Sequence, residues 1–124
     1  MRLKPILAAL ALLASSSLAA QQRGDWVLAQ WRGGQYWFPG VIQDISGKRV
    51  TILYDDGTRE TRPLSQVKPY DWREGSRVQC LWAGGSEWYS ARITRMSSDG
   101  VTITVRYDDD GIVEKTRTGA CRSL

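Results

Sequence analysis

The segment GDWVLAQWRGGQYWFPGVIQDI, residues 24–45, decides the fold, because the chain repeats it as GSRVQCLWAGGSEWYSARITRM at residues 75–96. At a constant offset of 51, Trp31 corresponds to Trp82 and Phe38 to Tyr89, and two glycines follow each tryptophan at matched places. A self-similarity with a period of about fifty residues indicates two copies of one small structural unit.

Each copy is predicted to form short strands. WVLAQW and RVQCLW alternate between apolar and polar residues, while VTILY (50–54) and VTITVRY (101–107) are rich in β-branched residues. An acidic turn ending in Asp-Gly follows both of the latter. We therefore predict an all-β protein made of two tandem SH3-like, five-stranded barrels, at residues 21–70 and 71–124.

The join between the units falls within KPYDWREG, residues 68–75. Its aromatic residues, Tyr70 and Trp72, are either clasped between the two barrels, which would make a rigid pair, or exposed in the linker. Barrels this small bury little core and commonly need a further stabilising crosslink.

The two cysteines can provide that crosslink. In the repeat alignment Cys80 replaces Ala29 and Cys121 replaces Val67. If these positions touch across the first and last strands of a unit, we expect a Cys80–Cys121 disulfide, and two buried free thiols are the alternative. Such a bond persists outside the reducing cytoplasm.

Residues 1–20 have the pattern of a signal peptide. Arg2 and Lys4 precede an apolar run that is too short to span a bilayer, and small residues follow it. We expect cleavage near Ala19 or Ala20 and an exported protein, periplasmic or secreted, without a membrane span in the mature chain.

Charge and residue types narrow the function classes. Loss of Arg2 and Lys4 leaves 15 basic against 13 acidic residues and lowers the net charge from +4 to +2, which disfavours nucleic acid as the partner. The chain has no histidine, the usual general base and the commonest zinc ligand. We expect a binding protein, with neither catalytic residues nor a cofactor nor a metal site; the carboxylates lack the spacing of a calcium loop.

Aromatic and acidic residues recur together in both units. In a small bent barrel the ends of neighbouring strands converge, which predicts two matched clusters. Box 1 contains Trp31, Phe38, Tyr54 and Asp56, and box 2 contains Trp82, Tyr89, Tyr107 and Asp109. Aromatic faces around a carboxylate attract an alkylammonium or guanidinium group.

These residues resemble the Tudor family. The order Val-x-x-x-Trp, Phe/Tyr-x-Gly/Ala-x-Ile and Tyr-Asp-Asp-Gly is similar to that of Tudor domains, and the duplication is similar to that of tandem Tudor readers. The resemblance implies that both boxes are cages for methyl-lysine or methyl-arginine on a protein partner. It also implies a fourth aromatic wall just past the turn glycine, where this chain has Thr58 and Ile112. We expect at most one box to bind well, because Asp110 is an extra residue in the second turn.

Other interpretations of the aromatic residues stay open. The tryptophans and tyrosines of the boxes can mainly pack the barrels of an envelope structural or protein-interaction module. Tyr36, Trp37 and Trp88 flank the box residues and should point to the opposite strand face, toward either an exposed contact surface or the barrel interior.

Overall fold

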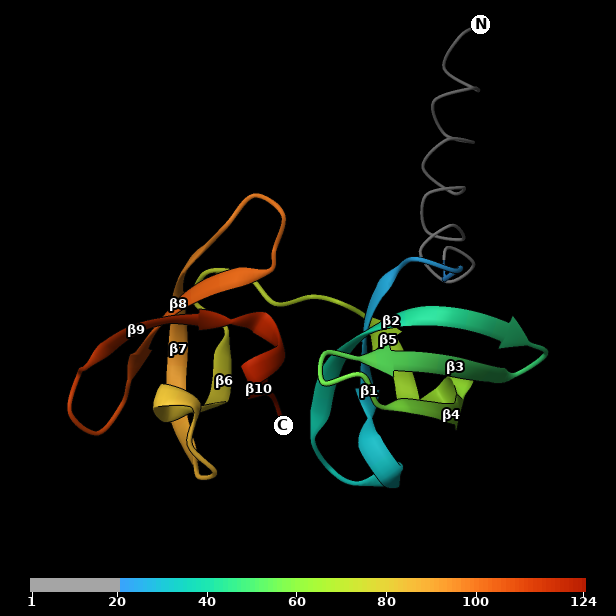
Figure 1. Cartoon of the computed structure of the whole chain (residues 1–124), viewed down its shortest axis with the longest axis horizontal. Coiled ribbons are helices and arrows are strands. Elements are labelled where there is room, and N and C mark those ends of the chain that lie inside the picture. Colours follow the sequence, from blue (N-terminus) through green and yellow to red (C-terminus); the bar gives the residue numbers. More distant parts are fainter. Residues whose placement is uncertain (1–20) are drawn as a thin grey trace, which may run out of the picture.

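The structure is a computed structural model that describes residues 21–124, so the expected signal peptide at residues 1–20 lies outside the described part. Figure 1 shows two groups of strands that follow one another along the chain, with the C-terminus between them. Each group is a five-stranded antiparallel sheet, and within residues 21–124 the helical elements are short 3-10 turns. The predicted all-β fold of two tandem SH3-like barrels is confirmed. No helix in this range is long and apolar enough to cross a membrane.

The two sheets have the same strand order. The first barrel runs β4-β3-β2-β1-β5 across the sheet and the second runs β9-β8-β7-β6-β10. The first consists of β1 (Trp26–Gln30), β2 (Trp37–Ser46), β3 (Arg49–Tyr54), β4 (Arg59–Pro63) and β5 (Val67–Pro69). The second consists of β6 (Arg77–Leu81), β7 (Trp88–Met96), β8 (Thr102–Tyr107), β9 (Val113–Arg117) and β10 (Cys121–Arg122).

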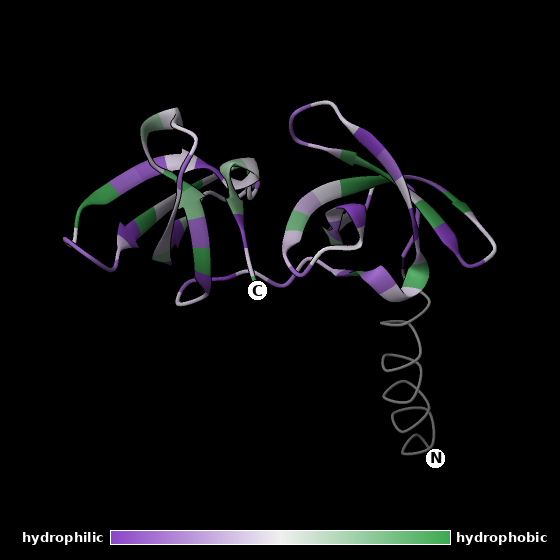
Figure 2. Cartoon of the chain, turned by 90° about the horizontal axis from the view of Figure 1, so that it is seen from below, coloured by the Kyte–Doolittle hydropathy of each residue, from purple (hydrophilic) through white to green (hydrophobic). Residues whose placement is uncertain are grey.

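Alternating side chains build the core of each barrel. In β3, Val50, Ile52 and Tyr54 are buried and the residues between them are more exposed, and β8 repeats this pattern. Figure 2 shows apolar and polar residues taking turns along several strands. The register of β2 against β3 shifts after Ile42, and β7 shifts at the matching place after Ile93. A bulge of this kind bends a strand, as closing a small barrel requires.

The cysteines form the predicted disulfide. Ala29 of β1 lies opposite Val67 of β5, and Cys80 of β6 lies opposite Cys121 of β10 in the same register. Cys80 and Cys121 are fully buried and joined by a disulfide. The repeat alignment therefore identified a contact between the first and last strands of a unit, and the bond is typical of proteins outside the cytoplasm.

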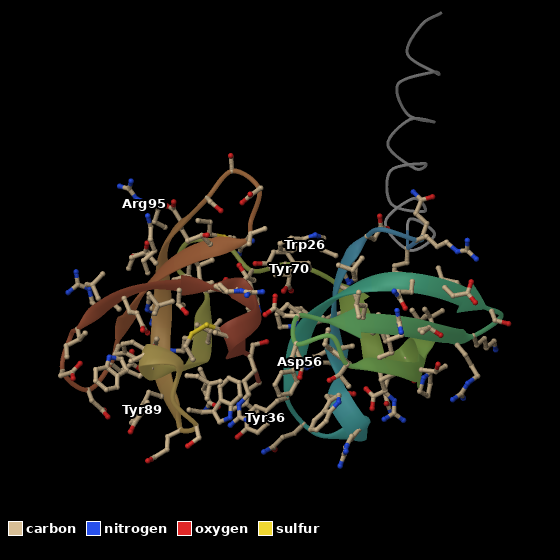
Figure 3. All side chains as sticks on the ribbon, in the orientation of Figure 1. Trp26, Tyr36, Asp56, Tyr70, Tyr89 and Arg95 are labelled. Atoms are coloured by element: carbon tan, nitrogen blue, oxygen red, sulfur yellow. A yellow bond between two sulfur atoms is a disulfide. The ribbon has the colours of Figure 1, made fainter. Side chains whose placement is uncertain are left out.

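Aromatic residues of the linker pack between the barrels. Trp72 is buried in the apolar cluster that contains the core of the second barrel together with Leu28 of β1. Tyr70 lies between Trp72 and Trp26, with ring centroids 5.6 Å and 5.2 Å away. Figure 3 shows Trp26 and Tyr70 in the space between the two barrels. Of the two interpretations of these aromatics, the structure shows the clasped arrangement.

The C-terminal segment makes a second set of contacts with the first barrel. Trp37 and Ser123 exchange backbone hydrogen bonds of 2.8 Å and 3.0 Å. Arg117 donates to Asp55 of the first acidic turn at 2.5 Å. Gly119 lies so close to Asp55 that a Cβ at position 119 would overlap its side chain. These contacts place the end of the second barrel against the cluster predicted as box 1.

Candidate functional site

The structure brings the four residues of each box around one cavity. Trp31, Phe38, Tyr54 and Asp56 all line one cavity of about 330 Å³, at the side of the first barrel that faces the second. The four residues of box 2 line a separate cavity of about 290 Å³, together with Ser90, Asp110 and Ile112. Both cavities lie where the ends of the strands meet. Figure 3 shows Asp56 facing the second barrel and Tyr89 at the far end of that barrel.

A 3-10 turn after the first strand of each unit positions the tryptophan. Trp31 begins the turn Trp31–Gly33 and Trp82 begins the turn Trp82–Gly84. The next residues, Arg32 and Ala83, have positive φ values of 55° and 52°. Trp31 and Trp82 are 37% and 49% exposed respectively, so neither tryptophan is a core residue.

The remaining aromatic walls come from the strands. Phe38 of β2 meets Trp31 edge to face, with ring centroids 6.2 Å apart. In box 2, Tyr89 of β7 meets Tyr107 of β8 edge to face at 6.4 Å. Tyr54 and Tyr107 end strands β3 and β8 and are buried, so their rings form the inner walls of the cavities.

Two glutamates that were not among the predicted site residues stabilise the boxes, one glutamate in each box. The Tyr54 hydroxyl donates to Glu60 Oε1 at 2.8 Å, and the backbone N–H of Arg32 donates to Glu60 Oε2 at 2.7 Å. Glu114 accepts from Tyr107 at 2.6 Å and from the backbone N–H of Ala83 at 2.8 Å. One carboxylate thus ties the inner tyrosine to the turn that carries the tryptophan. The matched position of the two glutamates after the acidic turns was the available signal.

These hydrogen bonds also set the protonation of the tyrosines. Burial raises the pKa of Tyr54 far above its ordinary value, and the hydrogen bond to the Glu60 carboxylate raises it further. Burial and Glu114 act in the same way on the pKa of Tyr107. Both hydroxyls therefore stay neutral donors to the glutamates at physiological pH.

The acidic turns differ in which aspartate bonds to the backbone. In the first turn Asp56 Oδ1 accepts the backbone N–H of Thr58 at 2.9 Å, and this bond lowers the pKa of the Asp56 carboxyl. In the second turn Asp110 makes the corresponding bond with the N–H of Ile112 at 3.0 Å, while Asp109 lies one residue earlier. The inserted residue therefore makes Asp110, by its hydrogen bond, the counterpart of Asp56, and both Asp109 and Asp110 line box 2.

Solved structures of other proteins resemble this fold. The crystal structure of the Crb2 tandem tudor domains superposes with a TM-score of 0.57 at 13% identity, covering 82% of this chain and 78% of that chain. The chain has a tandem Tudor-like fold. The Arabidopsis thaliana AGDP1 AGD34 structure also matches, with a TM-score of 0.38, 13% identity and 89% and 86% of the two chains covered. No protein-family model matches the sequence, and no curated protein matches it either.

The second Tudor-like barrel completes box 1 of the first. Trp88 and Arg122 line the box 1 cavity, and the ring of Trp88 lies 5.9 Å from that of Phe38, edge to face. The position just past the turn glycine, where a fourth aromatic wall was expected, is occupied by Thr58. Trp88 of the second barrel supplies an aromatic wall to this cavity instead. The Arg122 guanidinium lies over the rings of both Tyr36 and Trp88. Trp37 packs against the apolar cluster that contains the core of the second barrel. These residues form neither an exposed surface nor the interior of their own barrel: they are partly buried and contact the other barrel.

Proposed function

We propose that the chain is a non-enzymatic binding module whose boxes recognise methylated lysine, methylated arginine or another cationic group on a protein partner. One observation carries the proposal: in each box at least three aromatic rings and one or more aspartates line the same open cavity. The likeness to tandem tudor domains concerns the fold alone. The proposed ligand class is supported by the residues that line the cavities.

The chemistry of box 1 suits a cation without a strong hydration shell. Aromatic faces attract such a group by roughly 0.5–2 kcal/mol each, and the ionised Asp56 adds a hydrogen-bond acceptor. The Tyr54 hydroxyl is already bonded to Glu60, so Tyr54 contributes its ring and not its hydroxyl. A methylated ammonium gains from these rings and loses little hydration on entering the cavity.

The second candidate function is an envelope structural or protein-interaction module in which the aromatics mainly pack. The burial of Tyr54 and Tyr107 favours this alternative, since both rings also belong to the barrel cores. The exposure of Trp31 and Trp82 favours the first proposal, because both indoles remain accessible to a ligand in the cavities that they line.

Titration with modified peptides tests the proposal. Trimethyl-lysine, dimethyl-arginine and unmodified peptides are titrated while tryptophan fluorescence is recorded. We expect the modified peptides to bind saturably and the unmodified peptides not to bind. We expect the double variant Trp31→Ala and Trp82→Ala to lose this binding. These exposed residues are better targets than Tyr54 and Tyr107, whose removal would damage the core. Leu64→Ala is a matched control, because Leu64 is exposed and lies outside both cavities. No saturable response at millimolar ligand would refute the proposal.

A further inference from the structure

Box 1 contains two opposite charges that do not form an ion pair with each other. Asp56 and Arg122 both line the cavity, yet within residues 21–124 neither takes part in an ion pair. The other aspartate of the cavity, Asp55, is already paired with Arg117. The cavity therefore presents one available carboxylate and one available guanidinium, with aromatic walls around them.

The guanidinium of Arg122 is held in place by the second barrel and the first. It lies 3.6 Å from the ring centroid of Tyr36 and 4.2 Å from that of Trp88, and its Nε donates to Gln79 Oε1 at 2.9 Å. Nε is thus used for positioning, and within residues 21–124 no acceptor is bonded to the two terminal nitrogens. Partial burial lowers the pKa of Arg122, although an arginine keeps its charge at neutral pH. The charge is consequently fixed in position and incompletely hydrated.

Box 2 provides an internal comparison. Asp109 and Asp110 line it and no lysine or arginine does. The two cavities thus share their aromatic and acidic parts and differ in the positive charge. A simple cation meets only attraction in box 2, whereas in box 1 it also meets the charge of Arg122.

We propose that box 1 takes a dipolar group, in which a methylated ammonium lies against the rings and Asp56 while a carboxylate a few bonds away pairs with Arg122. This inference rests on the proposed function and names the ligand class of its first box. The planar guanidinium has two terminal nitrogens, a geometry that matches the two oxygens of a carboxylate. Two sources have this chemistry: a modified lysine beside an acidic residue in a protein partner, or a small free zwitterion.

A matched pair of small probes tests the charge preference. γ-Butyrobetaine carries a trimethylammonium and a carboxylate, and its methyl ester keeps the ammonium and blocks the anion. Both are titrated into the full chain carrying Trp82→Ala, which disables box 2, and the indole N–H signals are followed by NMR. The zwitterion should bind about fivefold more tightly than the ester, the size of a partly exposed ion pair.

Substitutions of Arg122 connect this preference to the residue. The ratio of the two affinities should fall to about one in Arg122→Gln, and Arg122→Lys should keep part of the preference because it keeps the charge. A thermal melt of each variant reports whether the barrels still fold. The Lys variant keeps the test decisive if the Gln variant unfolds.

Peptides separate the two sources of the ligand. A peptide with trimethyl-lysine followed by glutamate is compared with the same peptide carrying glutamine. Preference for the glutamate peptide, lost in Arg122→Gln, identifies a protein partner; preference limited to γ-butyrobetaine identifies a small zwitterion, and both results support a dipolar site.

The outcomes that overturn the two proposals differ. Equal binding of zwitterion and ester, unchanged by Arg122→Gln, refutes the dipolar site and leaves the cation box intact. Absence of binding by every ammonium probe and peptide, in the unaltered chain as well, refutes the proposed function and the dipolar site with it.

Discussion

The disulfide allows a prediction in which barrel 1 serves as the control for barrel 2. Cys80 and Cys121 occupy the register that Ala29 and Val67 occupy in the first barrel. The double variant C80A/C121V therefore replaces the crosslink by an apolar pair that the same fold already accepts. It removes the covalent constraint without burying a polar group or a charge.

The expected loss follows from the loop that the bond closes. The two cysteines are 41 residues apart. Closing a loop of that length lowers the entropy of the unfolded chain, which raises the free energy of the unfolded state by about 4 kcal/mol. We expect the free energy of unfolding of C80A/C121V to fall by about this amount and the midpoint temperature by about 20 °C. The assay is urea and thermal unfolding followed by tryptophan fluorescence.

The reciprocal variant checks the same reasoning in the other direction. A29C/V67C places two cysteines at the matching register of the first barrel, and under oxidising conditions it should gain up to about 4 kcal/mol. A loss below about 1 kcal/mol in C80A/C121V, with the fold unchanged, would refute the view that the crosslink is a main source of stability in the second barrel.

Three further predictions concern the box and the junction. Glu60→Ala leaves the Tyr54 hydroxyl without its acceptor and should lower the free energy of unfolding by about 2–3 kcal/mol in urea titrations; a change under about 0.5 kcal/mol would contradict the role given to this carboxylate. Gly119→Ala should break the contact with Asp55 and weaken ligand binding in box 1 while box 2 is unaffected, as NMR titration of the two sites would report. Burial raises the pKa of Tyr70 from 10.0 to about 12, so the folded state holds this proton at a pH where the unfolded state releases it. The contribution of Tyr70 to stability should therefore be constant below about pH 10 and be lost as the pH rises toward about 12, and tyrosinate absorbance that appears in full near pH 10 in the folded protein would count against this.

Contacts within one barrel could largely be predicted from the sequence. Strand pairing has a period of two and a fixed register, so the repeat alignment brought Cys80 to Cys121 and each tryptophan to its tyrosine. Glu60 was missed for a physical reason: a glutamate in an edge strand has the pattern of a solvent-facing residue, and its role depends on a tyrosine hydroxyl and a turn N–H reaching it from two other elements.

Contacts between the barrels could not be predicted in this way. Whether Trp88 faces solvent or Phe38, and whether Arg122 lies in box 1, depends on the angle at which the barrels dock. That angle is set by the packing of Tyr70 and Trp72 and by the bonds of Trp37 to Ser123, none of which has a local sequence pattern.

The sequence by itself predicted the two barrels, a crosslink in the second of them and the residues that line each cavity, because strand alternation and a repeat are local properties. Only the tertiary structure decided that the boxes are unequal. Side chains from the second barrel complete box 1 with a ring and a positive charge, since docking places surfaces together that are far apart in the chain. Box 2 keeps its acidic residues and receives no such partner within residues 21–124.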